Sequence, residues 1–165
     1  RTMQYLIYPM DERAAAEIIH WHYDPPYTLY NLDGDESEIE SMLDGYHFAV
    51  RAKEEGLVGF FCYGLSAQVP GGRARGLYGG KRVLDIGLGM RPDLTGKGLG
   101  QGFVQAGIDF AIARWRPLAM RLTVACDNLR AIKVYERLGF VITDSITTRT
   151  PHGHQDYFIM LLTLE

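Results

Sequence analysis

Residues 95–100 read Thr-Gly-Lys-Gly-Leu-Gly, and they stand between a predicted strand, Val83–Met90, and a segment with an apolar helical pattern, Gly100–Ala113. Glycine permits the backbone conformations that a tight turn needs. The first amide groups of a helix have no partner inside the helix, and the positive end of its dipole favours anions. The stretch therefore predicts a strand-to-helix turn that binds a phosphorylated cofactor.

Two common phosphate-binding patterns do not fit this turn. A nucleoside triphosphate loop needs Gly-x-x-x-x-Gly-Lys-Ser/Thr, but Arg91 occupies the position of the first glycine and Gly98 that of the hydroxyl residue. The dinucleotide pattern Gly-x-Gly-x-x-Gly needs a glycine at Pro92, Gln101 or Phe103, depending on where it starts. Both classes of cofactor site are therefore excluded.

A second pattern lies further along the chain, where residues 128–140 read Asn-Leu-Arg-Ala-Ile-Lys-Val-Tyr-Glu-Arg-Leu-Gly-Phe. With the glycine turn before it, this segment resembles the GNAT superfamily of acetyl-CoA-dependent N-acetyltransferases. Its family pattern, Asn-x-x-Ala-x-x-x-Tyr-x-x-x-Gly-Phe, is matched at every position. In the family's loop pattern, Gln/Arg-x-x-Gly-x-Gly/Ala, Gly98 and Gly100 match and Thr95 departs, which removes a side chain that helps to hold the loop or a phosphate.

The resemblance implies a mixed, α+β-like α/β fold in which residues 1–165 form one domain. Its central twisted sheet has six or seven strands, is flanked by about four helices, and contains two parallel strands that splay apart to admit the pantetheine arm of acetyl-CoA. The expected cofactor-binding residues are Leu88, Gly89, Met90, Thr95, Gly96, Lys97, Gly98, Leu99, Gly100, Gln101 and Asn128. No metal is expected.

The chemistry requires an acid and a base. An alkylammonium acceptor has a pKa of about 10.4, so it must lose a proton before it attacks. By resemblance, Tyr135 protonates the departing thiolate, and its alternative is a core aromatic. Asp85 is the candidate base because it interrupts an apolar strand on the face opposite Leu84 and Ile86; its alternatives are a solvent-facing carboxylate and a water relay.

The acceptor is predicted only by class. By resemblance, its wall is formed by Trp21–Asn31 and by the turn Pro151–Asp156. The candidate contacts in the first segment are His22, Tyr27, Tyr30 and Asn31, although such an aromatic cluster also suits the end of a core. The segment from Asn128 to Met160 is also similar to the ribosomal-protein N-terminal alanine acetyltransferases, but Thr123 replaces the glutamate base of that subgroup.

Composition restricts the partners. The formal net charge is −3, which gives no basic field for nucleic acid or an anionic membrane. No apolar run approaches the roughly 18 residues of a membrane span, and no signal peptide is expected. Cys62 and Cys126 both stand in apolar runs, which predicts reduced core thiols and a cytoplasmic location.

Hydrophobic periodicity predicts the order of elements. The predicted strands are Met3–Tyr8, His47–Lys53, Leu57–Leu65, Val83–Met90, Met120–Cys126, Phe140–Thr148 and Asp156–Leu164. The predicted helices are one capped by Asp11, with Ala15, Ile18, Ile19 and His22 on one face, then Ser37–Leu43, Gly100–Ala113 and Leu129–Leu138. Residues 66–80 are expected to form a mobile, glycine-rich loop, and the strand Asp156–Leu164 is expected to be exposed and able to pair across a homodimer.

The sequence thus predicts an enzyme that moves an acetyl group from acetyl-CoA to a primary amine by direct attack in a ternary complex. A small-molecule amine is the first acceptor, and a protein N-terminus or a lysine is the alternative. A non-catalytic module that senses acyl-CoA is the alternative of another class.

Overall fold

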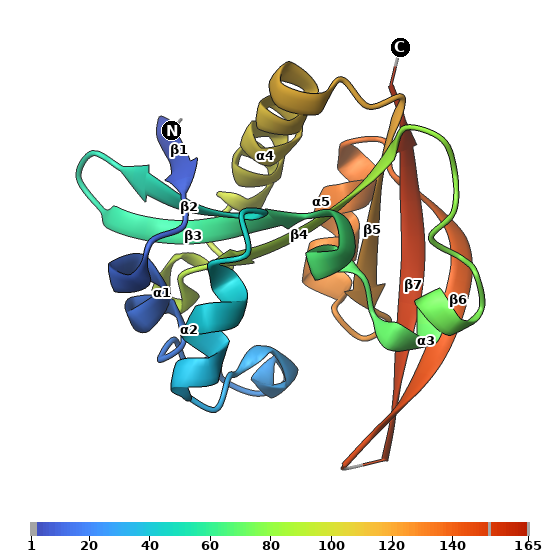
Figure 1. The fold of residues 1–165 in the computed structure, drawn as a ribbon, viewed down its shortest axis with the longest axis horizontal. Coiled ribbons are helices and arrows are strands. Elements are labelled where there is room, and N and C mark those ends of the chain that lie inside the picture. The colour runs from blue at the N-terminus through green and yellow to red at the C-terminus, as the bar shows by residue number, and fades with distance from the viewer. Residues whose placement is uncertain (1–2, 152, 165) are drawn as a thin grey trace.

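The computed structural model describes residues 3–151 and 153–164, and in them a seven-stranded mixed sheet is flanked by helices (Figure 1). The strands are β1 (Tyr5–Pro9), β2 (His47–Ala52), β3 (Gly56–Tyr63), β4 (Val83–Met90), β5 (Ala119–Ala125), β6 (Val141–Thr150) and β7 (Gly153–Thr163). The α-helices are α1 (Glu12–Ile18), α2 (Glu36–Met42), α3 (Pro70–Ala74), α4 (Gly100–Trp115) and α5 (Leu129–Arg137). Three 3-10 turns, η1 (Thr28–Tyr30), η2 (Gly64–Ala67) and η3 (Pro92–Leu94), lie between them. The expected mixed fold is confirmed.

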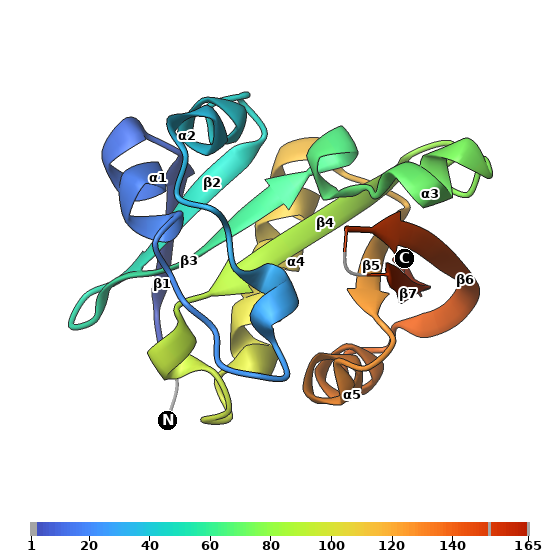
Figure 2. The ribbon, with the colours of Figure 1, turned by 90° about the horizontal axis from the view of Figure 1, so that it is seen from below.

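The sheet opens in its middle. Its order is β1-β2-β3-β4-β5-β7-β6, and only the neighbours β4 and β5 run parallel. They pair from Val83–Asp85 to Ala119–Arg121 and then separate, so the rest of β4 pairs only with β3 and the rest of β5 only with β7. Seen from below, the two strands diverge towards α5 (Figure 2). This fork positions the candidate site.

The prediction that the C-terminal strand Asp156–Leu164 is exposed and free to pair is wrong. β7 lies between β5 and β6 and pairs with both along most of its length, so it has no free edge for a second chain. The edge strand on this side is β6, where Val141 and Ile142 are exposed. Strand pairing in a homodimer would therefore use an edge strand of the sheet, β6 or β1.

The two faces of the sheet are covered by different helices. α1 and α2 cover one face of β1–β3, and α4 covers the other (Figure 1). The predicted apolar stripe of α4 is buried against the sheet: Phe103, Val104, Gly107, Ile108 and Ala111. A Cβ at Gly107 would lie 2.6 Å from the Phe61 ring, so glycine is what lets α4 approach β3 this closely. The N-terminus of α4 is thereby fixed beside the fork.

The first helix begins as expected and ends earlier. The Asp11 carboxylate accepts a hydrogen bond from the Ala14 amide at 2.8 Å, which caps α1. The helix ends at Ile18, with Ile19 at its C-cap, so His22 is not on its buried face but exposed in the segment that follows. Two prolines, Pro25 and Pro26, keep that segment from continuing the helix.

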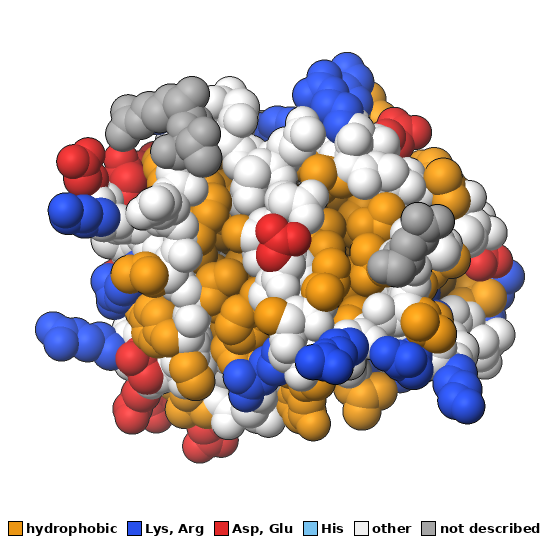
Figure 3. All heavy atoms as spheres, turned by 90° about the horizontal axis from the view of Figure 1, so that it is seen from above, with side chains coloured by type: hydrophobic (Ala, Val, Ile, Leu, Met, Phe, Trp, Pro, Cys, Tyr) orange, Lys and Arg blue, Asp and Glu red, His pale blue; other side chains and the backbone are white. Residues whose placement is uncertain are grey.

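Residues 66–80 have more structure than a glycine-rich loop. The segment contains part of η2 and all of α3, and the Arg121 guanidinium donates to the carbonyl groups of Leu77, Tyr78 and Gly79. On the surface of the molecule on the side of α4, hydrophobic side chains gather over the middle and Lys and Arg side chains lie around the rim (Figure 3).

Both cysteines are free thiols, with Cys62 buried and Cys126 partly buried. Among the described residues, every helix falls short of the length and hydrophobicity needed to cross a bilayer.

Candidate active site

A cavity of about 1040 Å³ occupies the fork between β4 and β5. It is lined by the open ends of both strands, by the glycine turn before α4, by α5, and by the connection between α1 and α2. Its charged lining residues are all basic and all come from α5: Arg130, Lys133 and Arg137. Within the described part of the chain, no carboxylate lines it. The cavity is therefore suited to an anionic ligand.

The glycine turn forms one wall. Gly96 and Gly98 have φ angles of +71° and +78°, a region that side chains other than glycine rarely adopt. The Thr95 hydroxyl donates to the Pro92 carbonyl at 2.7 Å and so fixes the start of the turn. Within residues 3–151 and 153–164, no acceptor engages the amide groups from Gly96 to Gln101. These donors are therefore free to bind an anion, and the predicted contact with a diphosphate stays a prediction.

Most of the predicted residues of the turn reach the cavity. Thr95, Gly96, Gly98, Gly100 and Gln101 line it. Lys97 and Leu99 do not, so a contact from either would have to come from the main chain or from a side chain that moves.

The open edge of β4 supplies main-chain groups to the cavity. The Arg91 amide donates to the Val58 carbonyl of β3 at 2.8 Å, so by alternation the polar groups of Gly89 also face β3. Those of Leu88 and Met90 face the fork. A hydrogen bond supports this assignment: the Tyr23 hydroxyl, which comes from outside the sheet, donates to the Met90 carbonyl at 2.6 Å. Of the three predicted residues on β4, Leu88 and Met90 can therefore bond a ligand strand, whereas Gly89 cannot.

Helix α5 brings Asn128 and Tyr135 to the same cavity. The Asn128 side chain caps the helix by accepting from the Ala131 amide at 3.3 Å, and it donates to the Tyr30 hydroxyl at 2.9 Å. Tyr135 is 8% exposed, and its hydroxyl bonds to no described residue. Among the described residues, every fully buried side-chain nitrogen or oxygen has a hydrogen-bond partner. Because the Tyr135 hydroxyl has none, it is not fully buried, and it must be open to the cavity that Tyr135 lines. Burial raises the pKa of Tyr135 above its ordinary value.

The segment between α1 and α2 contributes differently from the prediction. Tyr27 and Tyr30 line the cavity, but His22 and Asn31 do not. The Asn31 amide instead bonds the main chain of Tyr23, accepting from its N–H at 2.6 Å and donating to its carbonyl at 3.1 Å. Trp21, Tyr23 and Leu29 line the cavity within the predicted wall Trp21–Asn31, although they were not among its candidate contacts, and Leu32 lines the cavity just beyond that wall. Part of the predicted turn Pro151–Asp156, at residue 152, lies outside the described residues.

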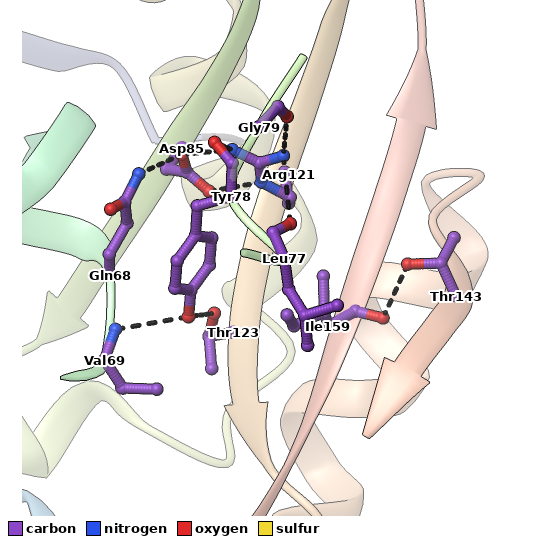
Figure 4. A network of polar contacts seen from close by, with 10 residues as sticks. All are labelled: Gln68, Val69, Leu77, Tyr78, Gly79, Asp85, Arg121, Thr123, Thr143 and Ile159. Atoms are coloured by element: carbon purple, nitrogen blue, oxygen red, sulfur yellow. Dashed lines mark hydrogen bonds and ion pairs between the residues drawn. The ribbon is translucent and has the colours of Figure 1, made fainter. Parts of the chain in front are cut away.

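The candidate base Asp85 does not line the cavity. It lies at the last paired position of β4 and β5, where it is bonded to Arg121 (Figure 4). Its side chain is 3% exposed and forms an ion pair with Arg121, whose Nε and Nη2 donate to its two oxygens at 2.6 and 2.7 Å. Gln68 donates to the same carboxylate at 2.8 Å. Asp85 therefore matches neither the solvent-facing carboxylate nor an accessible base, because its oxygens are already occupied by donors.

Beside this ion pair, Thr123 lines the cavity, and its hydroxyl bonds the Tyr78 hydroxyl at 2.7 Å (Figure 4). The Tyr78 oxygen also accepts from the Val69 amide at 3.2 Å.

Among the described residues, no group of three His, Cys, Asp or Glu side chains is arranged to hold a metal ion.

Comparison with known proteins agrees with this geometry. Residues 15–140 match the model of the acetyltransferase (GNAT) family. The chain belongs to the GNAT family of acetyltransferases. The expectation drawn from the glycine turn and the Asn-to-Phe pattern is therefore confirmed.

Part of this GNAT chain is similar to curated mycothiol acetyltransferases. A mycothiol acetyltransferase from Streptomyces coelicolor is 32% identical over 121 residues, which are 73% of this chain and 35% of that protein. The chain thus spans about a third of the length of the curated relatives it matches.

Solved structures share the fold. A spermidine N-acetyltransferase chimera from Vibrio cholerae and hSSAT has a TM-score of 0.73 at 18% identity and covers 97% of this chain and 95% of its own. A Salmonella typhimurium protein, solved with its cofactor acetyl-CoA, has a TM-score of 0.65 at 21% identity and covers 98% and 94%. These likenesses establish the architecture of the GNAT chain.

The glycine turn gives a prediction with a matched control. A Cβ at Gly98 or at Gly102 would meet open space, but only Gly98 has a positive φ. We expect Gly98→Ala to cost about 1–2 kcal/mol of backbone strain in the turn and to weaken CoA binding several-fold. Gly102→Ala, in the first turn of α4, should keep CoA affinity and stabilise the helix by up to about 1 kcal/mol. Calorimetric titration with CoA and thermal unfolding measure both effects, and equal losses of affinity in the two variants would contradict the role of the turn.

Proposed function

We propose that this protein transfers an acetyl group from acetyl-CoA to a primary amine of a small molecule by direct attack in a ternary complex. One observation carries the proposal: a single cavity joins the glycine turn, the Tyr135 hydroxyl and the aromatic segment between α1 and α2. Both substrates can then meet beside one acid. The proposal treats residues 1–165 as one catalytic domain and, with both thiols free, includes a cytoplasmic location.

The residues divide the work of binding. The amide groups from Gly96 to Gln101 and the start of α4 bind the diphosphate. Leu88 and Met90 offer main-chain groups to the pantetheine arm, in the way that a neighbouring strand would. Acetyl-CoA supplies the thioester whose carbonyl carbon the amine attacks.

Tyr135 is the proposed acid. As the C–N bond forms and the C–S bond breaks, its hydroxyl gives a proton to the departing sulfur. A hydroxyl that is open to the cavity and has no described partner is free to do this. The pKa of Tyr135 is raised by burial, which keeps the hydroxyl protonated at neutral pH.

The proposed proton acceptor for the amine is water. Asp85 is occupied by Arg121 and Gln68, and among the described residues no carboxylate reaches the lining of the cavity. Thr123 offers a hydroxyl in the lining, held by Tyr78, to position such a water. An amine with a low pKa is then acetylated fastest near neutral pH, because more of it is uncharged.

The lining also favours one class of small acceptor. The segment between α1 and α2, here called the acceptor segment, presents Trp21, Tyr23, Leu29 and Leu32 to the cavity, and among the described residues no carboxylate lines the cavity to neutralise a second ammonium group. Binding a polyamine in such a cavity would leave its extra charges unpaired, which is costly. An amine with one ammonium group and an apolar or aromatic body fits better than spermidine, the substrate named for one structural neighbour.

A panel of amines tests the proposal. Release of CoA thiol from acetyl-CoA should be fastest with an arylalkylamine such as phenethylamine and at least tenfold slower with spermidine. Peptides with N-terminal alanine and with internal lysine test the protein-acetyltransferase alternative. Tight CoA binding without turnover on any of these acceptors would favour the sensing alternative and contradict the proposed enzyme.

A further inference from the structure

Arg130 lies between the cofactor turn and the acceptor segment. It stands in the first turn of α5, and its guanidinium carbon is 4.2 Å from the centre of the Tyr27 ring. On its other side, a Cβ added to Gly96 would be 3.2 Å from the Arg130 Nη1 atom. The side chain is therefore stacked on the acceptor segment while one of its donors reaches the glycine turn.

The donors of Arg130 are not used within the described part of the protein. Two other arginines near the fork show the contrast. Arg91 is bonded to Glu55 and Asp93, and Arg121 is bonded to Asp85 and three carbonyl groups. Arg130 has no ion pair and no hydrogen bond with a described residue, and its guanidinium makes a cation–π contact with the Tyr27 ring instead. Its donors can therefore be given to a ligand.

The position of Arg130 is also unfavourable for the helix itself. A cation in the first turn of a helix faces the positive end of the helix dipole, where acidic residues are preferred. The other residues of that turn do not compensate, since none is acidic. Such a residue lowers helix stability slightly, so its placement beside a phosphate-binding turn suggests that it serves a ligand.

We propose that Arg130 binds the diphosphate of CoA and that Tyr27 holds it in position, so that cofactor binding also orders the acceptor segment. This inference rests on the proposed function of the cavity. It also accounts for Thr95, which stands where related sequences carry glutamine or arginine. Thr95 offers no charge at that position and Lys97 does not line the cavity, so the cation that faces the cavity comes from α5.

Calorimetric titration with three ligands tests the assignment. Arg130→Met keeps the stem but removes the donors, and it should weaken CoA binding at least tenfold, since a charge-assisted pair with phosphate is lost. Dephospho-CoA, which retains the diphosphate, should show the same loss. Pantetheine, which has no phosphate, should bind wild type and variant equally. Lys53→Met removes an exposed charge on the β2–β3 turn and should change none of these affinities.

The variant should remain folded, because removing a cation from the first turn of α5 does not destabilise the helix. Its thermal midpoint should equal or exceed that of the wild type. Arg130→Lys should recover part of the affinity, as lysine keeps the charge but not the planar fork. Unchanged CoA affinity in Arg130→Met would overturn the inference, as would a loss that disappears with dephospho-CoA. If the wild type itself does not bind CoA, the proposed function has failed instead.

The role of Tyr27 has its own readout. Tyr27→Leu should weaken CoA binding about threefold through the lost stacking, whereas Tyr27→Phe should not. In the background of Arg130→Met, Tyr27→Leu should have no further effect. Hydrogen exchange should show that CoA protects residues 21–32 in the wild type but not in Arg130→Met. Additive effects, or equal protection in both proteins, would contradict the coupling.

Discussion

Tyr135→Phe is expected to lower turnover at least tenfold while acetyl-CoA affinity stays the same. A general acid contributes roughly 10²–10⁴-fold to a rate, and the substitution removes only the hydroxyl that is open to the cavity. The ring still packs edge-on against Phe140, with the ring centres 5.9 Å apart, so the fold should be preserved. Steady-state rates with the best amine of the panel and calorimetric titration with CoA measure the two quantities separately.

The pH dependence sharpens this prediction. Burial raises the pKa of Tyr135 above 10.0, so the protonated form, which is the proposed acid, persists to higher pH than for an exposed tyrosine. The value of kcat/KM should therefore rise with pH as the free amine loses its proton, and no falling limb should appear below pH 10. A falling limb below that pH in the wild type would contradict the assignment.

Tyr46→Phe is the matched control for the loss of a phenolic hydroxyl. Tyr46 is 54% exposed and does not line the cavity, so its turnover and pH profile should match those of the wild type. If Tyr135→Phe behaves like Tyr46→Phe, the Tyr135 hydroxyl has no catalytic role.

The features that the sequence predicted correctly depend on local physical chemistry. The α4 stripe, the strand Val83–Met90 and the Asp11 cap of α1 all follow from periodicity or from hydrogen bonds within a few residues. The glycine turn belongs to the same group, because positive φ angles at Gly96 and Gly98 are a local backbone requirement. These local features place the turn and the two helices that line the cavity, whereas the fold was predicted from the resemblance to the GNAT family.

The features that were missed depend on contacts between distant parts of the chain. Composition alone does not show that Asn31 bonds the main chain of Tyr23, or that Arg130 reaches Tyr27. The exposed position of His22 follows from the early end of α1, and helix ends are poorly fixed by periodicity. The interior place of β7 is a matter of strand order, which requires the whole sheet.

Asp85 shows both the strength and the limit of the pattern. The sequence correctly placed Asp85 on the strand face opposite the core-facing Ile86. It did not predict that Arg121 is the partner of Asp85. A signal was present: Arg121 interrupts the apolar strand β5 as Asp85 interrupts β4. In a parallel pair, opposite charges buried at facing positions of adjacent strands are best explained as an ion pair, and the register does place Asp85 opposite Arg121.

The ion pair between Asp85 and Arg121 lies where β4 and β5 begin to separate. Among the predicted variants, breaking this pair should lower the free energy of unfolding most. Asp85 and Arg121 form the last paired position of β4 and β5, and their side chains are only 3% and 7% exposed. Asp85→Asn leaves the Arg121 charge buried without a counter-ion, which should lower the free energy of unfolding by about 3–5 kcal/mol. Urea denaturation followed by circular dichroism measures the loss.

A double variant separates the charge from the packing. Asp85→Leu combined with Arg121→Met removes both charges, so it should be destabilised less than either single variant, because no unpaired charge remains buried. The Arg121 bonds to the carbonyl groups of residues 77–79 would also be lost, so some destabilisation should persist. Losses that simply add in the double variant would show that the two side chains do not act as a pair.

The same variants decide whether Asp85 has a chemical role as well. If it were the base, Asp85→Asn would flatten the rise of kcat/KM with pH even under conditions where the variant is fully folded. We expect the folded fraction of Asp85→Asn to keep the wild-type shape of this profile, because both carboxylate oxygens are bonded to Arg121 and the residue does not line the cavity. With that outcome, Asp85 is a structural residue that holds β4 and β5 together at the position where they part.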